Sequence, residues 1–412
     1  MRARLALLGG LMLLLALGLT AYAWRKPAGQ GQASGPIVIG LLHALTGPLA
    51  TSERPLVAAV KLAVDEINQG GGLLGRQVEL RIEDTRSTAN VTAGPAATRL
   101  ITEQHAVALF GCWSSGCRQA VQAVVEARHH LLFYPMAHEG MERSANIIYT
   151  GPTANQQILP ATDWAMQGFG RRVYLVGTDS LFSRRAHALL RDFIRLTGGQ
   201  VLGERYVPLG STEVGAVIAD LQRLQPDLVL NTISGDSNGA FFDALVAAAL
   251  TDLPLLSFSA AEPEMLAYGG GRLDRHFTAW SYLQSLPGPA NAAFLSRLRA
   301  LNGADTQASD PAVSAYVGVQ LWAAAVRELG STETEAVNAT VLQQSVRAPH
   351  GFASVDAQTR HIWRPLRIAQ VRPGGQLVEV LQIPQPIRPA PWPVFRSTEH
   401  WAAVVAASGV AP

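Results

Sequence analysis

Short apolar runs alternate with longer amphipathic segments from Ile37 onward. The first run, residues 37–42, predicts a buried strand, and the next segment places Leu56, Val60, Val64 and Ile67 at helical spacing. Further apolar runs predict strands at 77–83, 107–110 and 131–134, with helices expected at 93–103 and up to about Ala127. Such alternation is typical of a parallel sheet with helices on both faces.

The same alternation restarts after Gly151. Expected strands lie at 172–176, 201–207 and 228–230, and expected helices at 156–166, 183–196, 214–224 and 239–249. Since 412 residues exceed what one ordinary core accommodates, we predict an α/β protein with two doubly wound, Rossmann-like lobes. Ligands of such sheets bind outside the carboxyl ends of the strands. Polar loops are expected at those positions: 43–52, 113–115, 134–139, 178–182 and 234–238.

The composition of the chain argues against one class of function, the binding of nucleic acids. Hydrophobic residues make up 48% and charged residues 16%, as in a well-packed globular protein, and the formal charge is +2. Without Arg2 and Arg4 the basic residues would equal the 31 acidic ones. A near-neutral protein is not a nucleic-acid binder, because phosphate contacts need a basic excess.

The amino terminus has the pattern of an export signal. Arg2 and Arg4 precede an apolar run, and Ala21-Tyr22-Ala23 has the small-x-small form of a cleavage site. We therefore predict a signal peptide over residues 1–24, with an uncleaved membrane anchor as the alternative. Residues 25–36 have the composition of a flexible tether.

No catalytic or metal motif stands out. Cys112 and Cys117 fit no zinc pattern, and we expect them to be two small buried residues beside a turn, although an oxidising compartment would allow them to pair. No Gly-x-Ser-x-Gly elbow or phosphate-binding loop is present in the sequence. We accordingly expect no enzyme activity, no cofactor and no metal.

The polar loops carry a resemblance to a known family. The chain resembles the type I periplasmic solute-binding proteins, in particular the branch that binds urea and short-chain amides for ABC transporters. The similar segments lie in the same order as in that branch, and the most specific are Ile39-Gly40-Leu41-Leu42-His43, Phe110-Gly111-Cys112-Trp113-Ser114-Ser115, Leu132-Phe133-Tyr134-Pro135, Asn231-Thr232-Ile233-Ser234-Gly235-Asp236 and Trp363-Arg364-Pro365-Leu366-Arg367.

The resemblance implies a ligand cleft between two lobes and a set of site residues. One lobe would comprise residues 37–151 and 280–348, the other 152–279 and 349–392, followed by a C-terminal tail over 393–412. The implied ligand-binding residues are Trp113, Ser114, Ser115, Tyr134, Met136, Thr178, Asp179 and Phe182. The sequence departs from the branch at Met136, His138 and Ser180, which leaves the ligand open.

The chemistry of these residues suits a small neutral amide. Aromatic rings cover flat faces, while hydroxyls and a carboxylate match carbonyl and N–H groups. Asp179 is equally suited to capping the helix that follows it. The expected partners are urea or a short amide and an ABC-transporter permease in the inner membrane. The alternatives are a binder of branched-chain or other amino acids, and a membrane-associated sensor of urea or amides. In every case the ligand is expected to stabilise a closed arrangement of the lobes.

Overall fold

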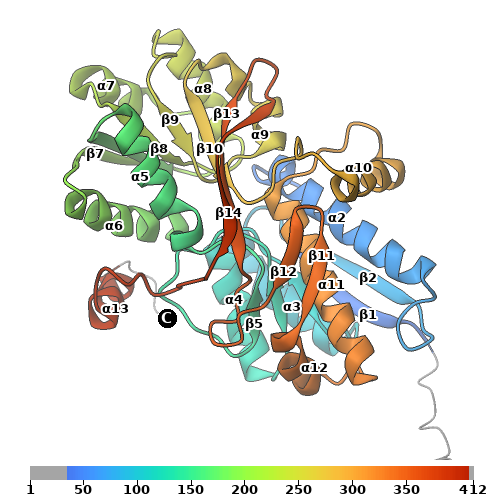
Figure 1. Ribbon diagram of the computed structural model, residues 1–412. Coiled ribbons are helices and arrows are strands. Elements are labelled where there is room, and N and C mark those ends of the chain that lie inside the picture. The colour runs from blue at the N-terminus through green and yellow to red at the C-terminus, as the bar shows by residue number, and fades with distance from the viewer. Residues whose placement is uncertain (1–34, 408–412) are drawn as a thin grey trace, which may run out of the picture. The chain divides into compact units, whose positions relative to one another are not determined.

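The computed structural model describes residues 35–407. The predicted export signal and nearly all of the predicted tether lie outside the described residues. From Ile37 onward the chain forms two lobes, each built around one β-sheet (Figure 1). The predicted two-lobe α/β fold is confirmed. Within residues 35–407 no helix combines the length and apolar character needed to cross a membrane.

The first lobe contains a five-stranded, fully parallel sheet in the order β2-β1-β3-β4-β5. Its central strands are short apolar runs with both faces buried, as parallel sheets require. The strands are β1 (Ile37–His43), β2 (Val78–Asp84), β3 (Leu109–Gly111), β4 (Leu132–Tyr134) and β5 (Ile147–Tyr149).

Helices from two separate parts of the chain cover this sheet. The later part contributes α11 (Asp310–Leu329), which is buried along most of its length and packs against α2 (Figure 1). Gly318 of α11 approaches β4 so closely that a methyl group there would lie 3.3 Å from Phe133 Cβ. The other elements of this lobe are α2 (Ala50–Gln69), α3 (Ala89–Thr102), α4 (Ser115–Ala127), α10 (Pro289–Asn302), α12 (Thr334–Thr340) and the hairpin of β11 (Ser345–Ala348) with β12 (Gly351–Ser354).

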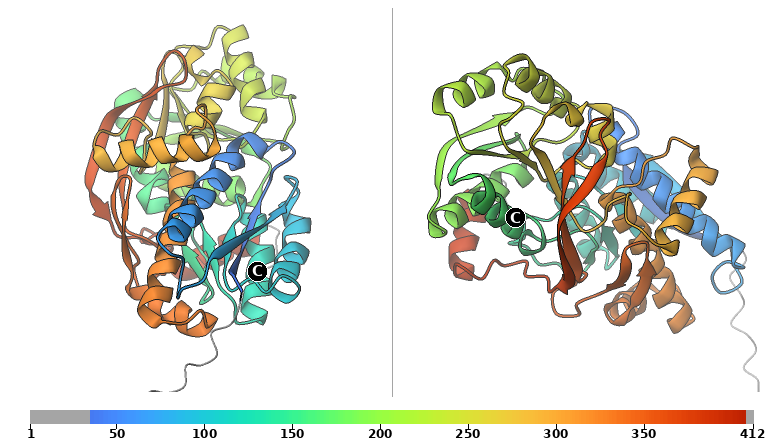
Figure 2. Two further views of the ribbon diagram at one scale, coloured as in Figure 1. Left: turned by 90° about the vertical axis from the view of Figure 1, so that its right-hand side faces the viewer. Right: turned by 45° about the horizontal axis from the view of Figure 1, so that its top comes forward.

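The second lobe contains a seven-stranded sheet in the order β14-β13-β10-β9-β8-β6-β7. Five strands are parallel, and the last two in sequence join antiparallel at one side. These two strands, red in Figures 1 and 2, lie along the side of the molecule and lead towards the first lobe. The strands are β6 (Arg172–Thr178), β7 (Gln200–Val207), β8 (Leu228–Thr232), β9 (Leu255–Ser257), β10 (His276–Trp280), β13 (Arg364–Val371) and β14 (Leu377–Ile387).

The helices of the second lobe follow the expected alternation with one difference. The helix expected at 156–166 is divided into a 3-10 turn (Ala154–Gln156) and α5 (Ile158–Phe169). Gln156 explains the break, because its side-chain amide donates to Ile362 O (3.0 Å) and Ile387 O (2.8 Å) of other segments. The remaining helices are α6 (Leu181–Leu196), α7 (Gly215–Leu224), α8 (Ser237–Ala247), α9 (Glu262–Ala267) and the C-terminal α13 (Thr398–Ala407), which packs on α6.

The chain passes between the two sheets three times. It leaves the first sheet after β5, returns after β10, and enters the second sheet again at β13. A single β-bridge joins Tyr149 of β5 to His361, so the third passage follows His361 and ends at Arg364. The lobe boundary predicted near residue 349 falls inside the β11–β12 hairpin.

Candidate functional site

A cavity lies where strand ends from both sheets meet. Its walls come from the segments that follow β1, β3, β4, β6, β7, β8 and β9, which is the edge where ligands of parallel sheets bind. The lining residues are Leu49, Trp113, Ser114, Met136, Ala137, Thr178, Ser180, Phe182, Leu209, Ser234 and Ser259.

The cavity is small and its lining is uncharged. The space that the centre of a water molecule can reach is about 50 Å³, enough for a small molecule but not for a peptide. Five lining residues carry hydroxyls and six are apolar. Two of the apolar residues, Trp113 and Phe182, bring aromatic rings from different lobes.

Two of the lining serines begin helices. Ser114 caps α4 by accepting a hydrogen bond from Cys117 N (3.1 Å), and Ser180 caps α6 by accepting one from Ser183 N (3.3 Å). Each hydroxyl accepts in its cap, so Ser114 retains its proton for donation to a ligand. Helix starts also favour electron-rich groups, so carbonyl oxygens suit this part of the cavity.

Thr178 joins two loops of the second lobe. Its Oγ1 accepts a hydrogen bond from Ser234 N (2.8 Å), and the side chain is buried beside the cavity. Since the oxygen is already an acceptor, its proton is directed to another acceptor such as a ligand carbonyl. Thr178 therefore both shapes the cavity and supplies a donor.

The structure brings five of the predicted site residues together: Trp113, Ser114, Met136, Thr178 and Phe182.

The other three predicted residues do not line the cavity. Ser115 is buried and donates to Glu139 Oε2 (2.8 Å). Tyr134 lies behind Trp113 and donates its hydroxyl to Trp113 O (3.0 Å). Asp179 is exposed and pairs with Arg184 Nε (2.8 Å), while the cap of α6 is Ser180.

The remaining lining residues were missed by the sequence reasoning. Leu49, Ala137, Ser180 and Ser234 lie inside the expected polar loops but were not predicted to contact the ligand, and Ser259 lies just after β9, outside those loops. Leu209 lies just after β7, outside those loops, and only the register of the two lobes reveals its position.

Loops from the two lobes touch at the side of the cavity. Asp236 N donates to Pro48 O (3.1 Å), and Gly235 lies so close that a Cβ there would be 2.3 Å from the same oxygen. Gly235 also has a φ of +66°, which favours glycine. The structure therefore holds the lobes in contact beside the cavity.

Cys112 and Cys117 form a disulfide, which corrects the expectation of two unpaired buried residues. The bond encloses Trp113 and Ser114, two residues of the cavity lining. Spacing alone gave no sign of this pairing, because the first turn of α4 is what folds Cys117 back towards Cys112. The bridge therefore restricts the loop that presents Trp113.

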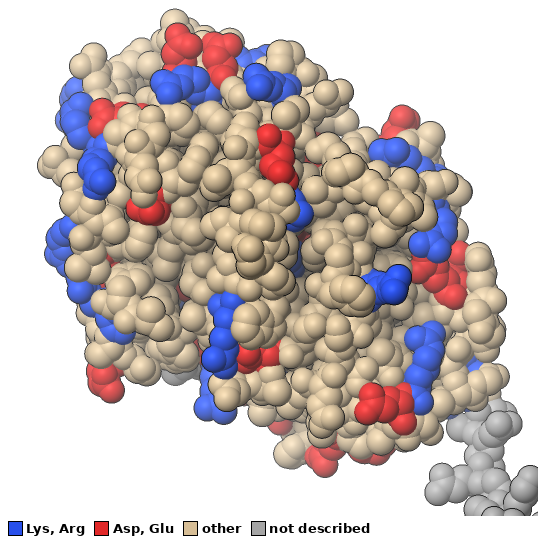
Figure 3. All heavy atoms as spheres, in the orientation of Figure 1, with Lys and Arg blue, Asp and Glu red and all other residues tan. Residues whose placement is uncertain are grey.

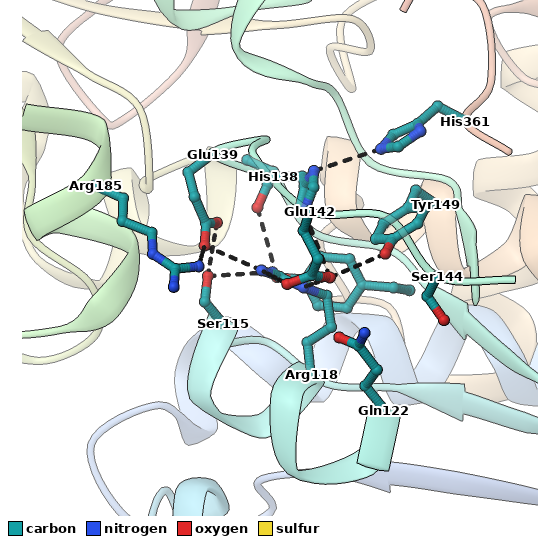
Figure 4. Close-up of polar contacts among 12 residues, drawn as sticks. Ser115, Arg118, Gln122, His138, Glu139, Glu142, Ser144, Tyr149, Arg185 and His361 are labelled. Atoms are coloured by element: carbon teal, nitrogen blue, oxygen red, sulfur yellow. Dashed lines mark hydrogen bonds and ion pairs between the residues drawn. The ribbon is translucent and has the colours of Figure 1, made fainter. Parts of the chain in front are cut away.

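A buried charge cluster lies next to this loop (Figure 4). Arg118 of α4 donates to Glu139 Oε1 (3.0 Å), to Glu142 Oε1 (3.0 Å) and to Ser115 Oγ (3.1 Å). Arg185 of α6 lies 3.5 Å from Glu139 Oε1. We call Arg118, Glu139, Glu142 and Arg185 the charge cluster.

The cluster keeps its carboxyl groups ionised. Burial alone raises the pKa of Glu139, but the charges of Arg118, His138 and Arg185 outweigh it and hold that pKa below its usual value. Burial likewise raises the pKa of Glu142, and Arg118 together with the nearby His138 ring holds that pKa well below its usual value. Within the described residues no group of histidine, cysteine or acidic side chains is arranged to hold a metal ion.

The protein surface agrees with the near-neutral sequence. On the face shown in Figure 3, basic and acidic side chains are interspersed, with no large patch of one sign. This distribution does not resemble the basic stripe that a nucleic-acid-binding face presents.

Comparison with known proteins gives a family match over most of the chain. A family model described as "Periplasmic binding protein domain" matches residues 37–398. Among curated proteins, "Leu/Ile/Val-binding protein homolog 7" of Brucella abortus is 27% identical over 218 residues, which are 50% of this chain and 54% of that protein. The chain thus matches about half the length of these curated relatives.

Solved structures share the fold at low identity. A solute-binding protein of an ABC transporter from R. palustris, in complex with 4-hydroxybenzoate, aligns with a TM-score of 0.78 and 22% identity, covering 87% of this chain and 98% of that one. The branched-chain amino acid transporter substrate-binding protein from Streptococcus pneumoniae, in complex with isoleucine, aligns with a TM-score of 0.73 and 19% identity, covering 84% and 99%.

Proposed function

Because the chain belongs to the periplasmic binding protein domain family, we propose that it captures urea or a short-chain amide for an ABC transporter. The family is extracytoplasmic and consists of solute-binding proteins rather than enzymes. The predicted export signal agrees with that location.

The uncharged lining of the cavity is the observation that carries the proposal. Among the described residues, no Asp, Glu, Lys, Arg or His side chain lines it. An amino acid would bring an ammonium group and a carboxylate into this space, and a buried charge without a partner is strongly unfavourable. An amide needs only donors for its carbonyl and acceptors for its N–H groups, and serine and threonine hydroxyls supply both.

The apolar part of the lining favours amides that carry a small apolar group. Trp113 and Phe182 offer ring faces, and Leu49, Met136 and Leu209 offer aliphatic surface. Acetamide, isobutyramide and benzamide each have a polar amide and an apolar group, which match the hydroxyl-bearing and the apolar parts of the lining. Urea has no apolar group to match the second part. Met136 and Phe182 would set how large that group can be.

A small aromatic carboxylate is the second candidate. The starts of α4 and α6, capped by Ser114 and Ser180, present N–H groups near the cavity, and such groups stabilise anions. Relatives in fold are described as complexes with benzoate and 4-hydroxybenzoate. A carboxylate here would rely on N–H and hydroxyl donors without a basic side chain.

The mechanism is closure of the two lobes around the solute. Contacts from both lobes, for example Trp113 and Thr178, are complete only when the lobes are together, so a bound solute stabilises that state. The closed protein would then be recognised by the permease of an ABC transporter. A membrane sensor that recognises the same closed state is the alternative partner.

Calorimetric titration with matched amide and acid pairs tests the proposal. The protein is unfolded and refolded to remove carried-over solute, then titrated with isobutyramide and isobutyrate, benzamide and benzoate, acetamide, urea and leucine. Each pair has nearly the same shape and differs in charge. Saturable binding of an amide, with its acid at least tenfold weaker, supports the proposal. Preference for the acids selects the second candidate, and binding of leucine alone contradicts both.

A further inference from the structure

We propose that Glu139 is a positioning residue whose carboxylate forms an ion pair with Arg185 of the other lobe. This ion pair links closure of the lobes to the position of the cavity wall. This inference rests on the proposed closure of the lobes but not on the identity of the solute. Glu139 belongs to the loop that follows β4 in the first lobe, and Arg185 belongs to α6 in the second. Their 3.5 Å contact is therefore a contact between lobes.

Glu139 is held in place by its own lobe. Arg118 Nη2 and Ser115 Oγ donate to its two carboxylate oxygens at 3.0 and 2.8 Å (Figure 4). The segment that continues from β14 of the second lobe also contacts this loop, because Met141 N donates to Pro391 O (2.8 Å). Gly140 lies against the same carbonyl, where a Cβ would be 2.1 Å from the oxygen. Arg118 and Ser115, both of the first lobe, thus position the carboxylate independently of Arg185.

The closed state is where the two charges meet out of water. The side chains of Glu139 and Arg185 are 0% and 1% exposed. When the lobes separate, Arg185 must move away from Glu139 because the two residues belong to elements of different lobes. In the closed state each charge is stabilised by its partner instead of by water, so removing either charge leaves the other buried without that partner and disfavours closure.

The same cluster supports the cavity wall. The Arg118 guanidinium lies 4.9 Å from the centre of the Tyr134 ring, and Tyr134 in turn donates to Trp113 O (3.0 Å). Trp113 lines the cavity. The ion pair between lobes and the ring that contacts the solute are therefore joined through two side chains. Formation of the Glu139–Arg185 ion pair therefore favours the arrangement in which both lobes line the cavity. A solute that stabilises this arrangement favours the ion pair to the same extent.

Distances between spin labels in the absence of any added solute test the inference. Lys61→Cys on α2 and Gln222→Cys on α7 place one exposed label on each lobe. The two native cysteines are joined to each other and do not react. Pulsed electron resonance then reports the fraction of molecules with the lobes together.

The variants are Glu139→Gln, Arg185→Met and the double variant, each in the labelled background. We expect either single change to shift the distance distribution to longer values, and the double variant to shift it no further. Arg184→Met is the matched control, since Arg184 is the neighbouring arginine and pairs with the exposed Asp179. We expect its distribution to match the parent.

Unchanged distances in the folded single variants, or shifts that add in the double variant, would overturn the inference. If Arg185→Met does not fold, Arg185→Lys decides the question, because it keeps the charge but loses the planar fork. A partial shift is expected for it, and an unchanged distribution rejects the role. Since no solute is added, the spin-label result does not depend on the titration. It stands even if no amide in the panel binds.

Discussion

Arg364 and Asp310 form a fully buried ion pair at the point where the three passages between the lobes meet. Arg364 Nη2 donates to both carboxylate oxygens of Asp310 at 2.6 Å, and both side chains are 0% exposed. Arg364 also donates to Ser281 Oγ (2.8 Å) and to Thr150 O. Since Arg364 itself ends the third passage, its guanidinium joins all three passages, and we call Arg364 and Asp310 the pivot pair because the proposed closure would turn about this point.

Breaking the pivot pair should destabilise the whole protein. Arg364→Met leaves Asp310 buried without its cation, and we expect the free energy of unfolding to fall by about 3–5 kcal/mol. Urea unfolding followed by circular dichroism measures it. Arg81→Met, which removes an exposed pair with Glu79, is the control and should change stability by less than about 1 kcal/mol. Equal effects of the two changes would contradict the assigned role.

Trp113 should carry much of the solute affinity. Trp113→Ala removes a ring that lines the cavity, and we expect at least about a tenfold loss of affinity for whichever panel solute binds, with the fold retained. Calorimetry on the refolded variant measures it. Trp164→Ala, on α5 away from the cavity, removes a ring of the same type. The solute affinity of Trp164→Ala should stay near that of the parent even if the stability of this variant falls.

Thr178 should act through its hydroxyl rather than its shape. Thr178→Val keeps the shape but leaves Ser234 N without its acceptor, which costs about 1–3 kcal/mol, and removes a donor to the solute. We expect weaker solute binding in this variant, measured by calorimetry. Thr178→Ser keeps the hydroxyl and should retain most of the affinity. Equal losses in the two variants would show that the methyl group matters as much as the hydroxyl and would contradict this prediction.

Glu262 should make stability depend on pH. Burial raises the pKa of its carboxyl to about 8, against a partly opposing hydrogen bond from Gln284 N (2.6 Å), and the charges of Asp310 and Glu264 add to the rise. Between the usual pKa and this one the folded protein holds a proton that the unfolded chain has lost. Stability is therefore lost as the pH rises from about 4.5 towards 8.

Glu262→Gln removes this titration. We expect the variant to gain stability relative to the parent between pH 5 and pH 8, by on the order of 3 kcal/mol at most. Urea unfolding at pH 5, 6.5 and 8 measures the difference. Glu213→Gln, at an exposed position, is the control, and its free energy of unfolding should change with pH in parallel to that of the parent. A parallel curve for Glu262→Gln as well would contradict the raised pKa.

Reduction of the disulfide should loosen the loop of Trp113. The bridge closes a short ring, since the two cysteines are 5 positions apart, and a ring of this size stabilises the fold by about 2 kcal/mol in the chain-entropy account. Thermal unfolding with and without reductant should show a lower midpoint after reduction, and solute affinity should fall with it. In the variant with both cysteines changed to alanine, reductant should have no effect.

The sequence pattern predicted the architecture because strands of a parallel sheet are buried on both faces and therefore contain runs of apolar residues. β1 and β8 begin with the apolar runs 37–42 and 228–230, and loops such as 113–115 follow strand ends at which ligands of such sheets bind. Trp113 and Thr178 were reached in this way, together with the family resemblance. The break at Gln156 before α5 gave no periodic signal, because it depends on hydrogen bonds to segments far along the chain.

Contacts between distant segments could not be predicted in the same way. Tyr134 and Ser115 lie in the expected loops, yet their side chains turn to Trp113 O and Glu139 instead of the cavity. Asp179 points to Arg184 at the surface. The direction of a side chain at a strand end depends on how neighbouring loops pack, and a single sequence does not record it.

The late return of the chain to both lobes has a consequence for folding. α11 supplies the buried helix beside α2, and β13 and β14 complete the second sheet only after residue 363. Because neither lobe has all its parts until the last portion of the chain is available, the contacts that complete the fold join residues hundreds of positions apart. A chain that is still being synthesised would therefore stay incompletely folded until its last portion is made, and an incompletely folded chain is the form that a secretion channel can thread.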